Sequence, residues 1–264
     1  MARRSLPDEP TAAEAGFTRA WLGRHGITAD RQTRLLALRV GSREQARRSY
    51  QVLFGLYGGV WVIVALAELP VPVRFLLVSA VFAVVPLLQW RRVRPRERAA
   101  ARLAPAGDRL PLRVTARQVG WWSLASVLVT FGGGVVLCVA RFSTSPVAAV
   151  SWAAALAVGA GSTALVLGPA LRAPVIAEDP TSLAADAVLR AQDVVMFAPS
   201  AVFALLACVD FAETWPSVPP WFPVRVGYVV LALGTGFAAQ VRCRRLPVAA
   251  PAGGGPGVSG STPS

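Results

Sequence analysis

The chain has 264 residues, of which 54% are hydrophobic and only 16% are charged, and its mean hydropathy is +0.51. This composition excludes an ordinary soluble domain and predicts an all-α integral membrane bundle that crosses the bilayer several times. All 27 basic residues are arginine and the net charge is +13. Many of these arginines lie in segments next to apolar runs. A basic segment beside a membrane is explained more simply by binding to anionic lipid than by binding to nucleic acid, so we expect no nucleic-acid partner.

Residues 1–48 are polar and predict a cytoplasmic N-terminal arm that is partly helical. Thr11 and Glu14 have the spacing of a capping box, which marks the start of a helix. A second helix is expected to begin near Asp30 and to end before Gly41. Both a partner-binding arm and an amphipathic segment at the lipid headgroups would show this pattern.

Six apolar runs follow within residues 49–246, each long enough, with its flanks, to cross a hydrocarbon core of about 30 Å. They cover 52–69, 73–90, 119–140, 147–171, 194–212 and 224–240. Pro70 and Pro72 form a tight turn, so the runs are expected to pair as three hairpins. Pro199 predicts a kink in the fifth run. Residues 247–264, rich in Pro, Gly, Ser and Ala, predict a disordered cytoplasmic tail.

The stretch 91–117 carries nine arginines against Glu97 and Asp108, and we expect a cytoplasmic loop there. With the N-terminus inside, 24 of the 27 arginines fall on the inner side. This asymmetry predicts a six-helix protein of the bacterial inner membrane, with both termini in the cytoplasm and an anionic inner leaflet as its surroundings. The candidate lipid or partner contacts in the loop are Arg91, Arg92, Arg94, Arg96 and Arg98.

Residues 172–193 form the acidic stretch of the inner side. Asp179 followed by Pro180 predicts a helix start, and Asp186, Arg190 and Asp193 share one face of that helix. These three are further candidate contacts for a protein partner. Their carboxylates would either pair with arginines of the 91–117 loop or stay free for a basic partner, and the tethered loop favours internal pairing.

The segment from Glu178-Asp179-Pro180 to Leu189-Arg190 contains the pattern DP…L.AAD..LR. It resembles a segment of uncharacterised multi-pass membrane proteins of high-GC actinobacteria. The chain departs from that pattern at Ala187-Val188, where a second acidic residue is often found. The resemblance implies a bacterial inner-membrane protein and carries no activity with it.

The chemistry available to the apolar runs is sparse. The ionisable residues near the outer ends are interpreted as boundary charges that reach for headgroups, with an outward-facing ion-pair cluster as the alternative. They are Glu68, Arg74, Arg141, Asp210, Glu213 and Arg225. His25 is the single histidine, and the sequence shows no nucleophile–base motif. We therefore expect no catalytic residue, no cofactor and no metal ligand.

Glycines interrupt the third and fourth runs at Gly132-Gly133-Gly134, Gly159 and Gly161. Unwound helices at transport sites use such residues, and so does tight helix packing, which is the favoured interpretation. The expected function is that of a non-enzymatic scaffold or accessory protein with a basic cytoplasmic face. The alternative is a small permease or export component with its site near these glycines, and the oligomeric state stays open.

Overall fold

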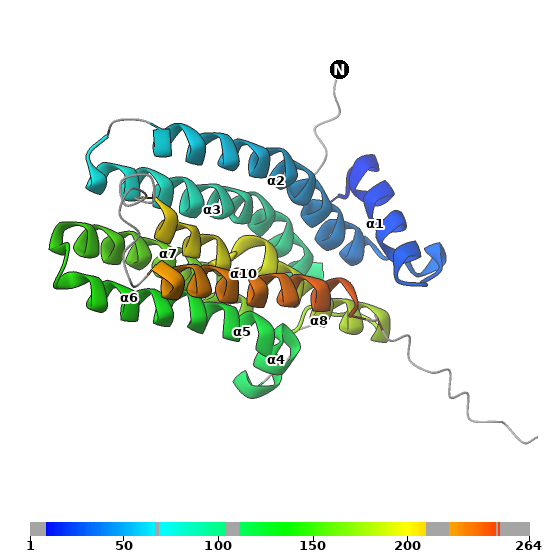
Figure 1. Ribbon diagram of the computed structural model, residues 1–264. Helices are drawn as coiled ribbons and strands as arrows, with labels where there is room; N and C mark the ends of the chain where they lie inside the picture. The colour runs from blue at the N-terminus through cyan, green and yellow to red at the C-terminus, as the bar shows by residue number, and fades with distance from the viewer. Residues whose placement is uncertain (1–8, 67–68, 104–110, 210–221, 247, 249–264) are drawn as a thin grey trace, which may run out of the picture.

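The computed structural model describes residues 9–66, 69–103, 111–209, 222–246 and 248, and every regular element within these ranges is helical. The long helices lie side by side along a common direction (Figure 1). In chain order the elements are α1 (Ala12–Arg24), η1 (Ala29–Arg31), α2 (Arg34–Leu66), α3 (Val71–Leu103), α4 (Leu112–Val119), α5 (Trp121–Val127), η2 (Leu128–Gly132), α6 (Gly133–Phe142), α7 (Pro146–Arg172), α8 (Pro180–Phe197), η3 (Ser200–Cys208) and α10 (Phe222–Arg244).

Five helical segments are long and apolar enough to cross a membrane. They are Val71–Leu103, Trp121–Phe142, Pro146–Arg172, Pro180–Cys208 and Phe222–Arg244. Large apolar side chains on them, such as Leu128, Val136 and Leu165, face outward, as expected where lipid replaces water around a bundle. The chain thus has the architecture of a multi-pass helical membrane protein. The first predicted run, 52–69, falls in α2 as far as Leu66, and residues 67–68 lie outside the described ranges.

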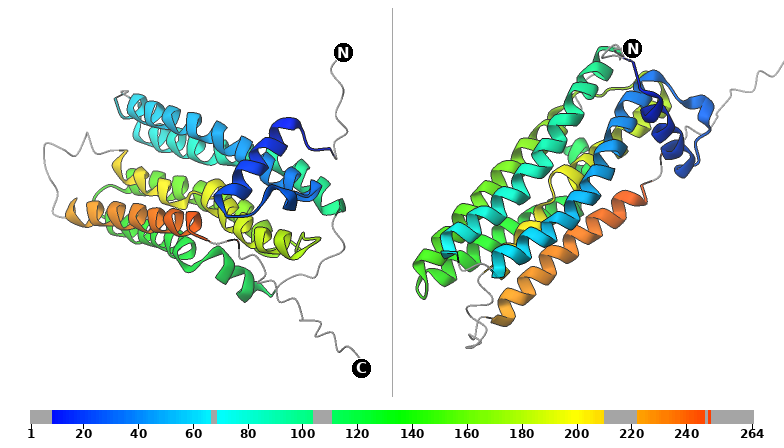
Figure 2. Two further views of the ribbon diagram at one scale, coloured as in Figure 1. Left: turned by 90° about the vertical axis from the view of Figure 1, so that its right-hand side faces the viewer. Right: turned by 90° about the horizontal axis from the view of Figure 1, so that it is seen from above.

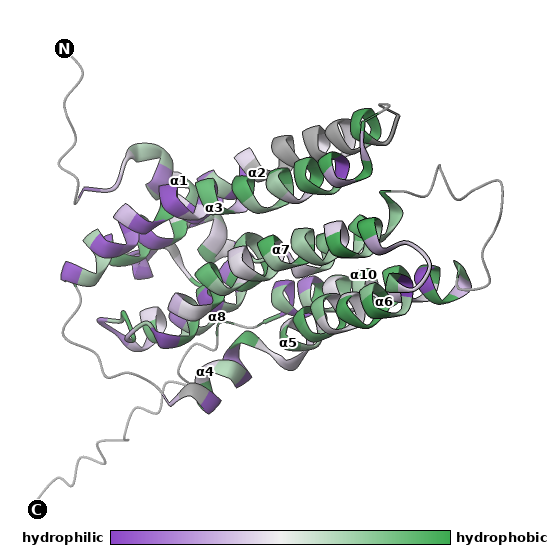
Figure 3. Cartoon of the chain, turned by 90° about the vertical axis from the view of Figure 1, so that its left-hand side faces the viewer, coloured by the Kyte–Doolittle hydropathy of each residue, from purple (hydrophilic) through white to green (hydrophobic). Residues whose placement is uncertain are grey.

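One end of the bundle is hydrophilic, and we call it the basic end (Figure 3). It comprises α1, the first half of α2, the last part of α3, α4 and the start of α8. Helices α2 and α3 each have 33 residues, or about 50 Å at 1.5 Å per residue, whereas a hydrocarbon core is about 30 Å thick. A large part of each helix therefore extends beyond an apolar layer at this end.

The 91–117 segment is not a loop over most of its length. Helix α3 continues without interruption to Leu103, and α4 begins at Leu112; residues 104–110 lie outside the described part. Hydropathy locates the end of the apolar run at Trp90 but not the end of the helix, because arginine and alanine continue a helix well.

Helix α1 and the first part of α2 lie within residues 1–48, but the second helix does not end where the sequence predicted. Helix α2 runs straight through Gly41, where a Cβ atom would lie 2.5 Å from the Cβ of Glu14. Gly41 is therefore a point of close approach between α1 and α2, and not the expected helix end. Thr11 and Glu14 do form the predicted capping box of α1.

The segment formed by α8 and η3 lies at the centre of the bundle. It packs against α2, α3, α7 and α10, and 56% of its apolar stretch is buried, against 28–39% for the other four segments. Figure 2 (left) shows it in yellow-green and yellow between α2 and α10. The segment breaks at Ala198 and Pro199, where the predicted kink lies, because proline lacks the N–H that would continue the helical ladder.

Candidate functional site at the basic end

Six ionisable side chains from α2, α3 and α8 meet inside the basic end, and we call them the ion-pair cluster. They are Arg39, Arg43, Glu97, Asp186, Arg190 and Asp193. Every member except Glu97 is at most 4% exposed. The spacing i, i+4 on α2 and i, i+4, i+7 on α8 directs each set to one helix face. The cluster has three arginines and three carboxylates and is therefore electrically balanced.

Asp193 and Arg43 form the tightest pair. The Arg43 Nε donates to Asp193 Oδ1 and its Nη2 donates to Oδ2, both at 2.6 Å, and Nη2 also reaches Glu97 Oε1 at 2.7 Å. Such two-pronged pairing is the strongest geometry available to arginine and a carboxylate. Burial opposes the charge on Arg43, but the charges of Asp193 and then Glu97 outweigh it and raise the pKa of Arg43, so this guanidinium stays charged.

Asp186 bridges the other two arginines. Its Oδ1 accepts from Arg39 Nη2 and its Oδ2 from Arg190 Nε, both at 2.7 Å. Arg190 also donates to the carbonyl oxygens of Ala173 at 2.9 Å and Pro174 at 2.6 Å, just beyond the end of α7. Cations stabilise a helix C-terminus because its last carbonyls lack helical partners. The cluster thus joins α2, α3 and α8 to the end of α7.

The energetics of this cluster depend on its being complete. Removing a charge from water costs several kcal/mol, which a partner offsets only with close geometry and further hydrogen bonds. Here the carboxylates of Asp186 and Asp193 accept on both oxygens, and Arg39 also donates to the carbonyl oxygen of Ile176 at 2.9 Å. Loss of one member would leave a buried charge without compensation, so the cluster fixes how the helices meet.

The structure brings together only some of the residues singled out from sequence. Asp186 and Asp193 do pair inside the chain, but their partners are Arg39 and Arg43 of α2 and Arg190 of α8, and not arginines of 91–117 in the described part. Sequence reasoning missed Arg39 and Arg43. A signal was present, because two arginines four residues apart lie among Leu35, Leu36, Leu38 and Val40, all of them buried.

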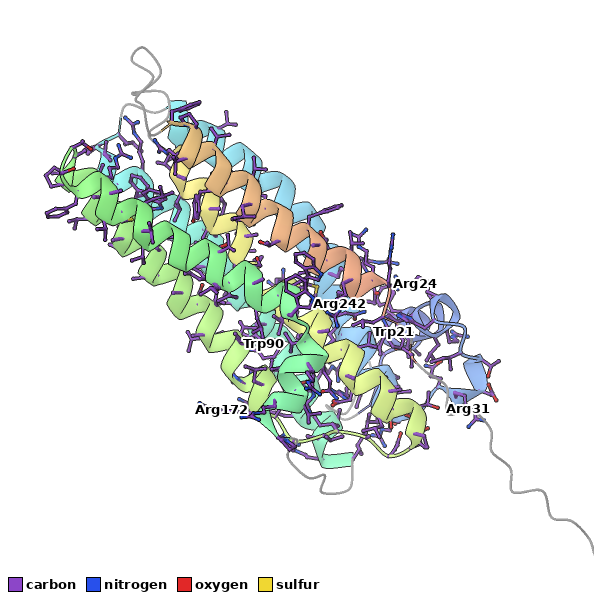
Figure 4. The ribbon with its side chains drawn as sticks, turned by 60° about the horizontal axis from the view of Figure 1, so that its bottom comes forward. Trp21, Arg24, Arg31, Trp90, Arg172 and Arg242 are labelled. Carbon is purple, nitrogen blue, oxygen red and sulfur yellow. The ribbon has the colours of Figure 1, made fainter. Side chains whose placement is uncertain are left out.

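The remaining candidates on α3 lie apart from the cluster. Arg96 pairs with Glu14 of α1 at 3.1 Å, and the Arg94 guanidinium lies 5.5 Å from the ring centroid of Trp90. Arg91, Arg92 and Arg98 are exposed. Figure 4 shows Trp90 at this end of the bundle together with Trp21, Arg172 and Arg242.

A groove of about 620 Å³ adjoins the cluster and shares Arg43 with it. One wall comes from α2 and the other from α10, while α8, the break at Pro199 and the start of η3 form its floor. Trp21 of α1 and Ser123 and Ser126 of α5 complete the lining. Leu233 and Phe237 of the α10 wall are 38% and 67% exposed, so the groove opens on the outer surface of the bundle. Its volume lies in the usual range for ligand sites.

The glycines of the third and fourth runs are contact points for side chains. A Cβ on Gly133 would lie 2.9 Å from the ring of Tyr228, and one on Gly159 would lie 2.6 Å from the ring of Phe203. Tyr228 also donates from its hydroxyl to the carbonyl oxygen of Thr130 at 2.7 Å, within the π-helical turn η2. These contacts favour the packing interpretation, and the groove described above does not include these glycines.

The opposite end of the bundle differs from expectation. Arg74, Arg141 and Arg225 are only 9%, 8% and 2% exposed, so they are buried, whereas charges that reach for headgroups would be exposed. The Arg74 Nε donates to the carbonyl oxygen of Leu69 at 2.7 Å. Glu68, Asp210 and Glu213, the acidic residues of the alternative ion-pair cluster, lie outside the described ranges.

The histidine and the three cysteines show no arrangement typical of a catalytic or metal site among the described residues. His25 stacks on Trp21 with ring centroids 4.1 Å apart, and its Nδ1 lies 2.8 Å from the Trp21 carbonyl oxygen. Cys138, Cys208 and Cys243 are free thiols. Among the residues that the structure describes, no group of three or more His, Cys, Asp and Glu side chains is placed to hold a metal ion.

Comparison with known proteins gives no relative: no family model, no curated protein and no solved structure is significantly similar to this chain.

Proposed function

We propose that the chain is a six-helix protein of the bacterial inner membrane, with both ends in the cytoplasm, and that it acts as a non-enzymatic scaffold or accessory protein. The sixth span would be the second half of α2. Residues 52–66 contain no Asp, Glu, Arg or His, and α2 lies along α3. The arginine distribution supports the orientation, because basic segments stay on the cytoplasmic side.

The observation that carries the scaffold function is the contrast between paired and exposed arginines at one end. The ion-pair cluster holds α2, α3, α7 and α8 together, while Arg91, Arg92 and Arg98 are exposed at the same end. A preorganised surface loses little conformational entropy on binding. The exposed arginines suit a protein partner with an acidic surface, which would bind beside the anionic inner leaflet.

The orientation is tested with single cysteines in a variant whose three native cysteines are replaced by alanine. Ser143→Cys, at the opposite end, should react with a membrane-impermeant maleimide on intact cells. Arg102→Cys, near the end of α3, should react only after the membrane is permeabilised. The reverse labelling would refute the proposed orientation.

Partner binding is tested by mild crosslinking and affinity isolation from native membranes. One variant carries glutamine at Arg91, Arg92 and Arg98, and its matched control carries lysine at the same positions. A partner that recognises basic charge should be recovered with the wild type and the lysine control and lost with the glutamine variant. Recovery of the same proteins from all three would contradict binding through this face.

A small permease is the second candidate, and one observation favours it at a place other than the glycine-rich runs. The helix break at Ala198–Pro199 lies on the groove floor, and broken helices form the solute sites of many transporters. Solute flux into proteoliposomes that is abolished by Pro199→Leu would favour the permease over the scaffold.

A further inference from the structure

We propose that the groove between α2 and α10 holds one anionic phospholipid of the inner leaflet, with its phosphate at the basic end and an acyl chain along the floor. This inference rests on the membrane placement proposed above. It adds a defined ligand site to the exposed basic surface proposed for partner binding.

The groove is amphipathic along its length. At the basic end its walls carry Arg43, Arg47 and Arg244, with Glu44 as the one acidic residue among its lining. Farther along the bundle the lining is mostly apolar and includes Met196, Val202 and Phe237. Its hydroxyls there include those of Ser126 and Ser200, which are hydrogen-bonded to each other at 3.0 Å. This polarity matches a molecule with a charged head and a hydrocarbon tail that lies parallel to the helices.

The charged groups still available at the polar end are hydrogen-bond donors, beside the amides of Gln192 and Gln240, which can both donate and accept. Arg43 is already held by Asp193 and Glu97, but the only acceptor of Arg47 among the described residues is Glu44, at 3.4 Å. Arg244 is exposed, and the described part of the chain offers it no acceptor. The indole Nε1 of Trp21 is buried in the lining without a hydrogen-bond partner in the described structure. Arginine and the indole nitrogen can only donate, so the head must supply acceptors and negative charge.

The length of the groove selects a lipid over a transmembrane helix. Along α10 the lining runs from Leu233 to Arg244, about 16 Å at 1.5 Å per residue. That is close to half of a hydrocarbon core of about 30 Å, the depth of one leaflet. A partner helix would cross both leaflets, whereas one acyl chain extends through only one.

The first test is native mass spectrometry of the full chain released from nanodiscs of phosphatidylcholine with a minor fraction of phosphatidylglycerol. The wild type should retain one phosphatidylglycerol molecule. Arg47→Gln combined with Arg244→Gln should weaken its retention about tenfold, which corresponds to about 1.4 kcal/mol. The matched control, Arg48→Gln with Arg245→Gln, removes the same charge from the neighbouring positions and should change retention less than about twofold.

Equal loss in both double variants would show general attraction to a basic surface and overturn the site. Retention that is the same in all three proteins would overturn it too. The same spectra report a second copy of the chain. If a dimer is present in the wild type and is lost only in the Arg47 and Arg244 variant, the occupant of the groove is a second copy of the chain and not a lipid.

The second test locates the lipid with a photoreactive residue on α10. At Leu233, which lines the groove, crosslinked lipid should be enriched in phosphatidylglycerol over the nanodisc average. At Leu231, which is exposed and outside the lining, it should match that average. Bulk composition at both positions would refute the groove site, even if the exposed arginines of α3 still recruit a protein partner. The lipid site and the scaffold function can therefore fail independently.

Discussion

The arginines of the basic end occupy two environments that are close in space and opposite in character. Arg39 and Arg43 are buried between helices and bind carboxylates, whereas Arg91 and Arg92 are exposed on α3. A buried charge stabilises only as part of a complete set, and an exposed one contributes little to stability and much to recognition. The same residue type therefore holds the helices together in one place and is left for binding in the other.

The largest expected effect comes from breaking the cluster at its tightest pair. Asp193→Ala leaves Arg43 buried with only Glu97 to balance it, and loss of one member of a buried pair costs about 3–5 kcal/mol. A denaturant titration of the detergent-solubilised protein gives the free energy of unfolding and so measures this loss. A destabilisation below about 1 kcal/mol would mean that Arg43 finds other partners and that the cluster is not structural.

Replacing both partners should sharpen the comparison. Asp193→Leu combined with Arg43→Met removes the stranded charge together with its partner, and apolar replacements of buried pairs are often close to neutral. We expect the double variant to regain more than half of the stability that Asp193→Leu loses alone. Additive losses in this double-mutant cycle would show that the two side chains are not coupled.

A medium effect is expected where α1 meets α2. In Gly41→Ala the new Cβ would lie 2.5 Å from the Glu14 Cβ and 2.6 Å from its Cα, and overpacking of this kind costs about 1–3 kcal/mol. Limited proteolysis between the two helices should become faster. Gly16→Ala is the matched control, since its Cβ meets nothing within 4 Å. Equal cleavage of the two variants would contradict the close approach.

The smallest effect on stability belongs to the exposed side of the comparison. Arg91→Gln with Arg92→Gln should change the free energy of unfolding by less than about 0.5 kcal/mol, as surface substitutions do. The amount of partner protein recovered with this variant from native membranes should decrease. A large stability loss would mean that these arginines belong to the fold rather than to a binding surface.

Local signals in the sequence determined much of the helical framework. The side chains of Thr11 and Glu14 cap α1, Asp179 caps α8, and Pro199 breaks the central segment. Each depends on neighbours within one or two turns, so the spacing alone predicts it. The common face of Asp186, Arg190 and Asp193 follows in the same way from helix periodicity.

Only the tertiary structure decided which charges meet. Arg39 is 147 residues from Asp186, and Arg43 is 150 residues from Asp193. With 27 arginines in the chain, the choice depends on which helices lie beside the central segment. The role of Gly41 was hidden for the same reason, because a glycine that ends a helix and one that admits a neighbouring helix look alike until the neighbour is in place.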